Sequence, residues 1–387
     1  MVKRAKAKNV RARKALLYIF TLLFSALYIY FGNAYAQTGM VAVAEQQTPS
    51  VRARIVEISD YVEEENASAY EEQVVVYKTY FRAELLQGEQ RGELVDCLQT
   101  VYSNFYPRQE LVEQGDKLLI YESAGGETPW LMLEYYRTDA LLILGALFVL
   151  AVILFGRFKG LNTIISLAFT CLAVFSVFVP AILSGKNIYI WTVITCLYII
   201  VMTMLLINGA DRKSFVAGAG CFAGVAAAAL ITLIMDKFLM LTGMIDDDTL
   251  YLLTLNVENP IDLRGVIFAM IAVGALGAIM DVAMDIASSL REIHFNSPQL
   301  AGRGLIRSGF NIGRDVMGTM ANTLVLAYIG SSLCVTLLLV VYNPSLQELF
   351  NMEMIIVEVL QALAGSFGIL LTIPLTSMIG AAVYTRS

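Results

Sequence analysis

The sequence predicts a mainly α-helical protein, a polytopic membrane bundle with a small β-rich extracytoplasmic domain near the N-terminus. Of the 387 residues, 57% are hydrophobic and only 16% are charged, whereas soluble globular domains average about 25% charged residues. Several apolar runs also approach the roughly 20 residues that a helix needs to cross a hydrocarbon core. The β-rich domain is predicted by short runs of β-branched and aromatic residues in the polar segment 45–133.

The distribution of charge and the few histidines and cysteines exclude several classes of function. The net charge of −6 is uneven, because acidic residues collect in the segment 45–137 and basic residues in the N-terminal tail and short loops. Nucleic-acid binding needs a continuous basic face, so we expect no nucleic-acid partner. The single histidine, His294, and the absence of a CxxC motif predict no metal cluster, no disulfide framework and no cofactor.

The N-terminal region, residues 1–36, consists of a basic tail and an apolar run that begins at Ala15. This order is typical of a signal peptide or a signal-anchor helix with its N-terminus in the cytoplasm. Ala34-Tyr35-Ala36 fits the small-residue cleavage pattern, so cleavage after Ala36 is an alternative to the uncleaved anchor that we favour. Either outcome places the following segment outside the cytoplasm.

The segment 45–133 is predicted to form a small β-rich domain. Its predicted strands are VRARIVEI (51–58), VVVYKTYFRAEL (74–85), ELVDCLQTVY (93–102) and KLLIYES (117–123). About 90 residues of short strands fit one small β-barrel or an open sandwich. The segment contains no recognisable nucleophile, general base or metal cluster, so we expect a structural or partner-binding domain.

The region 138–387 is predicted to form a seven-helix transmembrane domain. The spans are expected near 139–156, 161–183, 188–208, 215–240, 265–290, 316–342 and 354–384. With the N-terminal helix there are eight spans, so both termini are cytoplasmic if that helix is not cleaved. The predicted cytoplasmic loops 157–160, 209–214 and 291–315 carry most of the loop arginines and lysines, as short cytoplasmic loops do in membrane proteins.

Two carboxylates lie within the predicted span 265–290. Asp281 and Asp285, in the stretch GALGAIMDVAMDIASSL, are four residues apart and therefore project from one face of a helix. A charged aspartate at the centre of a span costs at least about 2.5–3.5 kcal/mol, and like charges on adjacent turns repel each other. The pair is expected to bind a cation, to relay a proton, or to be neutralised by polar groups of a neighbouring span.

The next stretch, AGRGLIRSGFNIGRDVMGTMANTLVLAYIGSSL (301–333), is predicted to be a glycine-rich cytoplasmic loop that leads into a helix near Arg314. It has neither the Gly-Lys-Ser/Thr of a P-loop nor the preceding strand of a dinucleotide fingerprint. Its arginines Arg303, Arg307 and Arg314 would hold an anion or a lipid headgroup, or would only anchor the loop to headgroups. Thr319 and Asn322 give the following helix polar positions that suit a protein contact or a wet cavity.

The strings SGFNIGRDVMGTMANTLVLAYIGSSL and GALGAIMDVAMDIASSL resemble the YibE/F family of bacterial membrane proteins. The resemblance extends from about residue 51 through the last predicted span. It implies a multi-pass protein of the bacterial plasma (inner) membrane with an N-terminal extracytoplasmic part. It implies no activity, cofactor or site residue, so the functional expectations depend on the residues alone.

Two functions from different classes fit these residues. A permease for an unidentified small solute or ion would use Asp281 and Asp285 for the coupling cation or proton. Thr319 and Asn322 would complete that site, with Arg314 at the cytoplasmic mouth. The alternative is a membrane-anchored scaffold or sensor whose β-rich domain binds an envelope partner. We do not expect an enzyme, because an intramembrane aspartyl site needs carboxylates from two helices and both lie on one. Either function involves the lipid bilayer, and the chain would act alone or in a homo- or hetero-oligomer.

Overall fold

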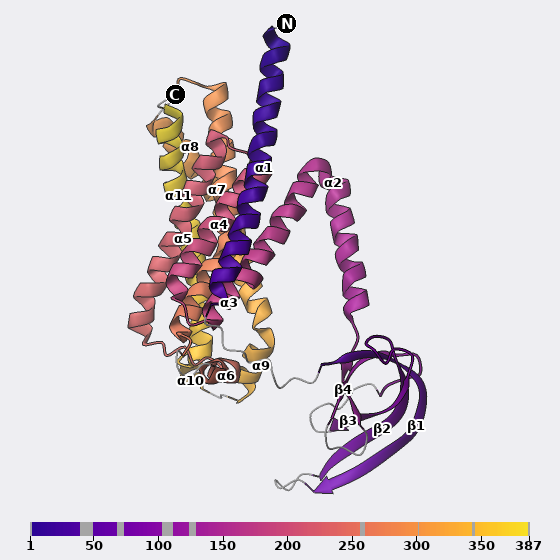
Figure 1. The fold of residues 1–387 in the computed structure, drawn as a ribbon. Coiled ribbons are helices and arrows are strands. Elements are labelled where there is room, and N and C mark those ends of the chain that lie inside the picture. Colours follow the sequence, from indigo (N-terminus) through magenta and orange to yellow (C-terminus); the bar gives the residue numbers. More distant parts are fainter. Residues whose placement is uncertain are drawn as a thin grey trace. The chain divides into compact units, whose positions relative to one another are not determined.

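The chain forms two compact units in the computed structural model (Figure 1). The structure describes residues 2–38, 49–67, 73–102, 111–123, 129–255, 260–300, 302–342 and 345–385. One unit is Ala42–Ala151, and the other combines Met1–Val41 with Val152–Ser387. The first is built on strands and the second is helical, as the sequence predicted.

The first unit contains a closed five-stranded barrel. Its strands are β1 (Val51–Ala67), β2 (Gln73–Leu85), β3 (Leu94–Tyr102), β4 (Lys117–Glu122) and β5 (Trp130–Tyr135). They pair in the order β1-β2-β3-β5-β4, and β1 closes the barrel against β4. The four predicted strands are confirmed. Strand β5, with the sequence WLMLEY, is an addition, because its run of apolar residues lacks the alternation that marks a half-buried strand.

Alternating residues of these strands fill the barrel. The buried cluster includes Ile55 of β1, Phe81 and Leu85 of β2, Cys97 of β3 and Ile120 of β4. Register shifts in the β1–β2 pair lie between Ile55 and Glu57 and between Ile58 and Asp60, and such bulges bend a strand and increase its twist. Beyond them, β1 and β2 continue to pair as far as Ala67 and Gln73, and β3 accompanies β2 as far as Val76.

Cys97 is expected to resist alkylation in the folded chain. Burial in the barrel raises the pKa of its thiol to about 12, and Asp96 adds to the shift. At pH 8 the reactive thiolate is therefore about a thousandfold scarcer than for a free cysteine. Labelling with iodoacetamide, read by mass spectrometry of the peptide containing Cys97, should be at least that much slower in the native protein than in the unfolded protein. Equal rates in both states would contradict the burial of this thiol.

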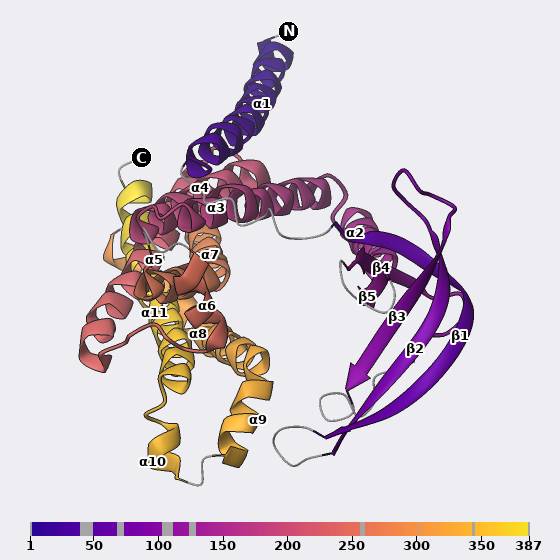
Figure 2. The same ribbon diagram turned by 60° about the horizontal axis from the view of Figure 1, so that its bottom comes forward.

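The second unit is a helical bundle, and one of its helices, α2, begins in the first unit. The elements of the bundle are α1 (Val2–Ala36), α2 (Thr138–Ala173), the π-helix η2 (Val174–Phe178), α3 (Val179–Leu183), α4 (Ile188–Asn208), α5 (Arg212–Leu239), α6 (Asp247–Leu255), α7 (Leu263–Asn296), α8 (Arg303–Ser331), α9 (Leu333–Tyr342), α10 (Leu346–Leu349) and α11 (Glu353–Thr385). Helix α7 is the centre of packing, with α4, α5, α8 and α11 around it (Figure 2).

Among the described residues, six helical segments are long and apolar enough to cross a membrane. They are Ala15–Ala36, Thr138–Leu183, Ile188–Asn208, Arg212–Leu239, Leu263–Asn296 and Glu353–Thr385. The segment Thr138–Leu183 is interrupted at Arg157, whose φ of 48° and ψ of −126° are not helical, so it comprises the two separate helices predicted at 139–156 and 161–183. Length and composition thus agree with a membrane protein.

The structure differs from the prediction in the region that follows α7. The expected loop 291–315 is reduced to a short connection, because α7 continues to Asn296 and α8 begins at Arg303. Two of the glycines that suggested a loop, Gly309 and Gly313, serve close helix packing instead. Side chains of α11 fill the space that a Cβ would need, Ser377 at Gly309 and Ile373 at Gly313. The expected span 316–342 is also interrupted at Ser332, where α8 ends and α9 follows.

Helices α5 and α11 approach each other closely at two glycines. Gly220 and Gly224 of α5 lie against Thr376 and Thr372 of α11, and a Cβ at either glycine would overlap the threonine hydroxyl. All four residues are buried. Small residues at four-residue spacing let two helix backbones approach closely, so these four positions form a continuous seam, called the α5–α11 seam below.

Candidate functional site

Helix α7 presents Asp281 and Asp285 on the side that faces away from the bundle core. Its buried side, which includes Ile279, Val282 and Ile286, packs into the main core cluster. Both aspartates are exposed. Gly277 is exposed as well, and a Cβ built on it would meet no atom within 4 Å. Asp281 and Asp285 therefore share one face, as predicted, and that face is open in the single chain.

Helix α8 is amphipathic. Its buried side consists of Leu305, Gly309, Gly313 and Leu324. Its exposed side carries a set of polar residues that we call the α8 polar face: Asn311, Arg314, Asp315, Thr319 and Asn322. This separation into one apolar and one polar side is typical of a helix that packs on a protein core and turns its other side to a polar environment.

The packing of α8 places its polar face alongside the apolar helices. Leu324 contacts Gly365 of α11, where a Cβ would lie 2.8 Å from Leu324 Cδ2. Together with the Gly309 and Gly313 contacts described above, this shows that α8 runs along α11. It also borders the open side of α7, because a Cβ at Gly274 would lie 2.7 Å from Tyr328 Oη. The α8 polar face therefore lies at the level of two helices that are apolar enough to span a membrane.

The structure does not join the predicted site residues into one bonded cluster. Within the described part of the chain, Asp281, Asp285 and Arg314 form no ion pair, with each other or with other residues, and Asn322 forms no hydrogen bond. Thr319 Oγ1 donates to Val316 O at 2.9 Å, a contact within its own helix. Of the three alternatives for the aspartates, neutralisation by an ion pair with α8 is not seen among the described residues; cation binding and proton relay stay predictions. The described residues also contain no group of three or more histidine, cysteine or acidic side chains that could hold a metal ion.

Three further predicted positions lie on helices instead of in a loop. Arg303 and Arg307 are exposed in the first two turns of α8, so the helix N-terminus expected near Arg314 lies at Arg303. His294 lies in the last turn of α7, where its ring stacks on Tyr384 with centroids 5.7 Å apart. The anion site expected at Arg303 and Arg307 stays a prediction.

Sequence reasoning missed a group of cations at one end of the helical unit. One pocket is lined by the cations Arg212 and Lys213 at the start of α5 and Arg291 near the end of α7. Tyr384, near the end of α11, lines the same pocket. The signal was available, because these cations belong to loops or a terminus that the charge distribution assigned to one side of the membrane. The sequence does not show that these helix ends meet around one pocket.

The family described as YibE/F-like protein matches residues 144–386, which is more than half of the chain. The matched region includes α7, α8 and most of the helical unit, and it begins after the barrel instead of near residue 51. A search of curated proteins and a search of solved structures gave no match.

Proposed function

Since the chain belongs to the YibE/F-like protein family, whose matched region contains α7 and α8, we propose that it is a multi-pass membrane permease for a small solute or ion. In this proposal α7 and the α8 polar face line a hydrophilic path. Asp281 and Asp285 bind the coupling cation or proton, and Thr319, Asn322 and Arg314 contribute polar contacts along the path. The protein moves its substrate without a catalytic step.

The observation that supports this proposal is the position of the α8 polar face. It runs beside α7 and α11, which are both long and apolar enough to cross a membrane. A polar or charged side chain exposed to hydrocarbon is unfavourable, and intramembrane polar groups are tolerated where they meet protein or water. The open side of α7, with its two carboxylates, borders α8 at Gly274. A hydrated path accounts for both features, and a second copy or another chain would separate it from lipid.

The charge distribution gives the proposed orientation. The ends of α5, α7 and α11 that carry Arg212, Lys213 and Arg291 belong to one side of the bundle, and cationic loops favour the cytoplasm. We therefore propose that this end is cytoplasmic in a bacterial plasma membrane and that the barrel lies outside.

The proposal is tested by the access of water to the α8 polar face. Asn322→Cys, in a chain whose native cysteines are replaced by alanine, is expected to react with a charged, membrane-impermeant thiol reagent in sealed vesicles. The matched control is Leu230→Cys on the exposed apolar side of α5. Leu230 lies at a similar level, because its near neighbour Ala228 packs against Gly368, one turn from the Gly365 that contacts Leu324.

We expect the Asn322→Cys variant to be labelled at least about tenfold faster than the Leu230→Cys variant, since thiolate formation needs water. Equal and slow labelling of both variants would mean that lipid or dry protein covers the α8 polar face. That result would contradict a hydrated path.

The scaffold or sensor remains the second candidate, supported by the outer surface of the barrel. Val56, Ile58 and Tyr61 of β1 are exposed apolar or aromatic side chains, and exposed apolar patches favour contact with a partner. If this function holds, the full chain carrying Ile58→Glu should lose a crosslinked envelope partner that the wild type retains. Full activity of a chain that lacks both Asp281 and Asp285 would also favour it.

A further inference from the structure

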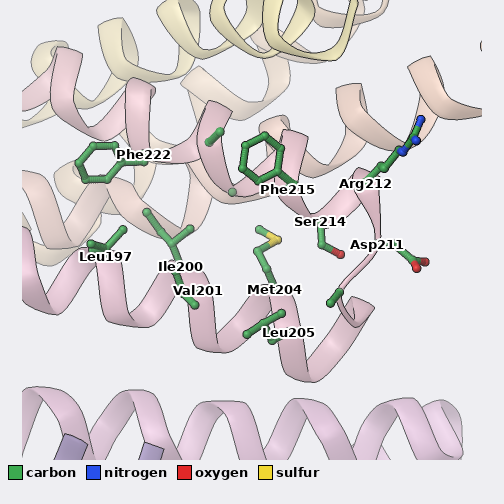
Figure 3. A pocket seen from close by; sticks show the side chains of 13 residues that line it. Leu197, Ile200, Val201, Met204, Leu205, Asp211, Arg212, Ser214, Phe215 and Phe222 are labelled. Carbon is green, nitrogen blue, oxygen red and sulfur yellow. The ribbon is translucent and has the colours of Figure 1, made fainter. Parts of the chain in front are cut away.

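Two pockets of different character meet at the connection between α4 and α5. The first has a volume of about 570 Å³ and lies between α4 and α5. Its walls are apolar, with Leu197 and Val201 on α4 and Phe215 and Phe222 on α5 (Figure 3). The second has a volume of about 720 Å³ and lies among the ends of α5, α7 and α11. Asp211 and Arg212 line both pockets, so the apolar pocket and the charged pocket adjoin at these two residues.

Ser214 marks the polar end of the apolar pocket. Figure 3 shows it beside Asp211 and Arg212. Ser214 is only 5% exposed, and its Oγ has no hydrogen-bond partner among the described residues. Buried hydroxyl groups are nearly always hydrogen-bonded, and an unpaired one calls for an explanation. An acceptor oxygen of a bound molecule, placed at this end of the pocket, would satisfy it.

The charged pocket favours an anion. Its cations are Arg212, Lys213 and Arg291, and its acids are Asp211 and Glu292. Asp211 pairs with Arg291 at 3.4 Å, and Glu292 accepts only from the uncharged amide of Asn296 at 3.0 Å. The three cations therefore exceed the two acids by one positive charge. Arg212 has no hydrogen bond or ion pair with the described residues.

The N-terminus of α5 adds to this preference for an anion. Asp211 is the N-cap of α5 but gives no side-chain cap hydrogen bond, so the first N–H groups of that helix and its dipole contribute to the positive potential.

We propose that the two pockets together bind one anionic phospholipid. Its phosphate lies at Arg212, Lys213 and Ser214, and one acyl chain lies in the apolar pocket between α4 and α5. A guanidinium binds phosphate oxygens through parallel N–H donors, and an apolar pocket at the lipid-facing surface of a bundle suits a hydrocarbon chain. Basic residues at the cytoplasmic end of a membrane helix are also the type of residue that anionic headgroups attract. A free phosphate would use only the charged half of this arrangement.

The test measures lipid binding by the full chain in detergent micelles, with native mass spectrometry as the readout. Phosphatidylglycerol and phosphatidylcholine with identical acyl chains are titrated separately, and inorganic phosphate is added as a competitor. We expect the wild type to retain phosphatidylglycerol at least about tenfold more tightly than phosphatidylcholine. Arg212→Gln should weaken phosphatidylglycerol binding about fivefold, as expected for one surface charge, with little change for phosphatidylcholine. Arg264→Gln, at the opposite end of α7, is the matched control and should leave both affinities unchanged.

A second variant tests the apolar half without changing any charge. Gly218 lines the apolar pocket, and a Cβ there would meet Ile200 and Met204 at ordinary distances of 3.6 and 3.8 Å. Gly218→Leu should therefore fold and fill the pocket, weakening phosphatidylglycerol binding, whereas Gly330→Leu, where a Cβ would meet nothing within 4 Å, should not.

Three results would overturn the proposal. Equal affinity for the two lipids would mean that charge is not recognised. Complete displacement of the lipid by millimolar phosphate, together with no effect of Gly218→Leu, would mean a free-phosphate site. A dimer that forms in the wild type and is lost in Gly218→Leu, without lipid dependence, would mean that a second copy occupies the pocket. None of these results depends on whether the chain transports a solute, so the proposed permease function is tested separately.

Discussion

Proton flux into vesicles that contain the Asp281→Asn chain is expected to fall at least about tenfold below that of the wild type. The substitution keeps the size of the side chain and removes its charge and its ability to exchange a proton. Because Asp281 is exposed and has no ion pair with the described residues, its replacement should leave the packing of α7 intact. The expected loss therefore concerns transport and not folding.

The measurement uses a pH-sensitive dye inside sealed vesicles under an imposed membrane potential. Asp248→Asn, at an exposed position of α6, is the matched control and should retain wild-type flux. Asp285→Asn is expected to reduce flux as well, since the two carboxylates share one helix face. Equal flux through wild-type and Asp281→Asn vesicles would contradict the coupling role. Wild-type flux no greater than that of protein-free vesicles would contradict proton coupling altogether.

Gly224→Ala is expected to destabilise the helical unit more than any other single added methyl group along the α5–α11 seam. A Cβ at Gly224 would overlap Thr372 Oγ1 and lie 2.9 Å from Ile279 Cγ2, so both α11 and α7 would have to move. Overpacking of this kind costs about 1–3 kcal/mol. Thermal unfolding of the purified chain in detergent, followed by circular dichroism, should show a clearly lower Tm.

A double-mutant cycle separates the clash from other effects of the added methyl group. Thr372→Ala removes the overlapping hydroxyl, which donates only within its own helix to Gly368 O at 2.7 Å. Two less severe approaches remain, 2.9 Å from the new Cβ to Ile279 Cγ2 and 3.1 Å to Thr372 Cβ, so the double variant should recover part of the lost stability but not all of it. Gly277→Ala on α7, with nothing within 4 Å of the new Cβ, is the control and should not lower the Tm. Strict additivity of the two substitutions would contradict the seam.

Much of the fold could be predicted from the sequence because strong, regular patterns specify it. The strand-rich segment alternates residue by residue, and the apolar runs have the length of a bilayer. Strand β5 and the start of α8 were missed for physical reasons. WLMLEY has no alternation, and the glycines of residues 302–318 indicate a loop when they are considered alone. Gly309 and Gly313 pack closely only because Ser377 and Ile373 of α11 lie against them. Those two residues are about 60 positions further along the chain, so a local sequence pattern does not include them.

The candidate site was predictable only in part. The four-residue spacing of Asp281 and Asp285 fixes that they share a face, because helix geometry is local. It does not fix which side of α7 meets its neighbours, since small and apolar residues occur on several sides of that helix. The lipid pocket was not predictable in the same sense. Its lining combines Arg212, Ser214, Arg291 and Tyr384, which become neighbours only when three helix ends meet.

The α5–α11 seam also limits how the protein can move. Two helices whose backbones are separated only by glycine hydrogens and threonine hydroxyls cannot slide or roll without collision, since packed interiors resist continuous deformation. Opening and closing of a permease would therefore carry α5 and α11 as one rigid body. Helix α8 would move with them, because Gly309 and Gly313 pack it just as closely on α11. The mobile counterpart would be α9, which the break at Ser332 separates from α8.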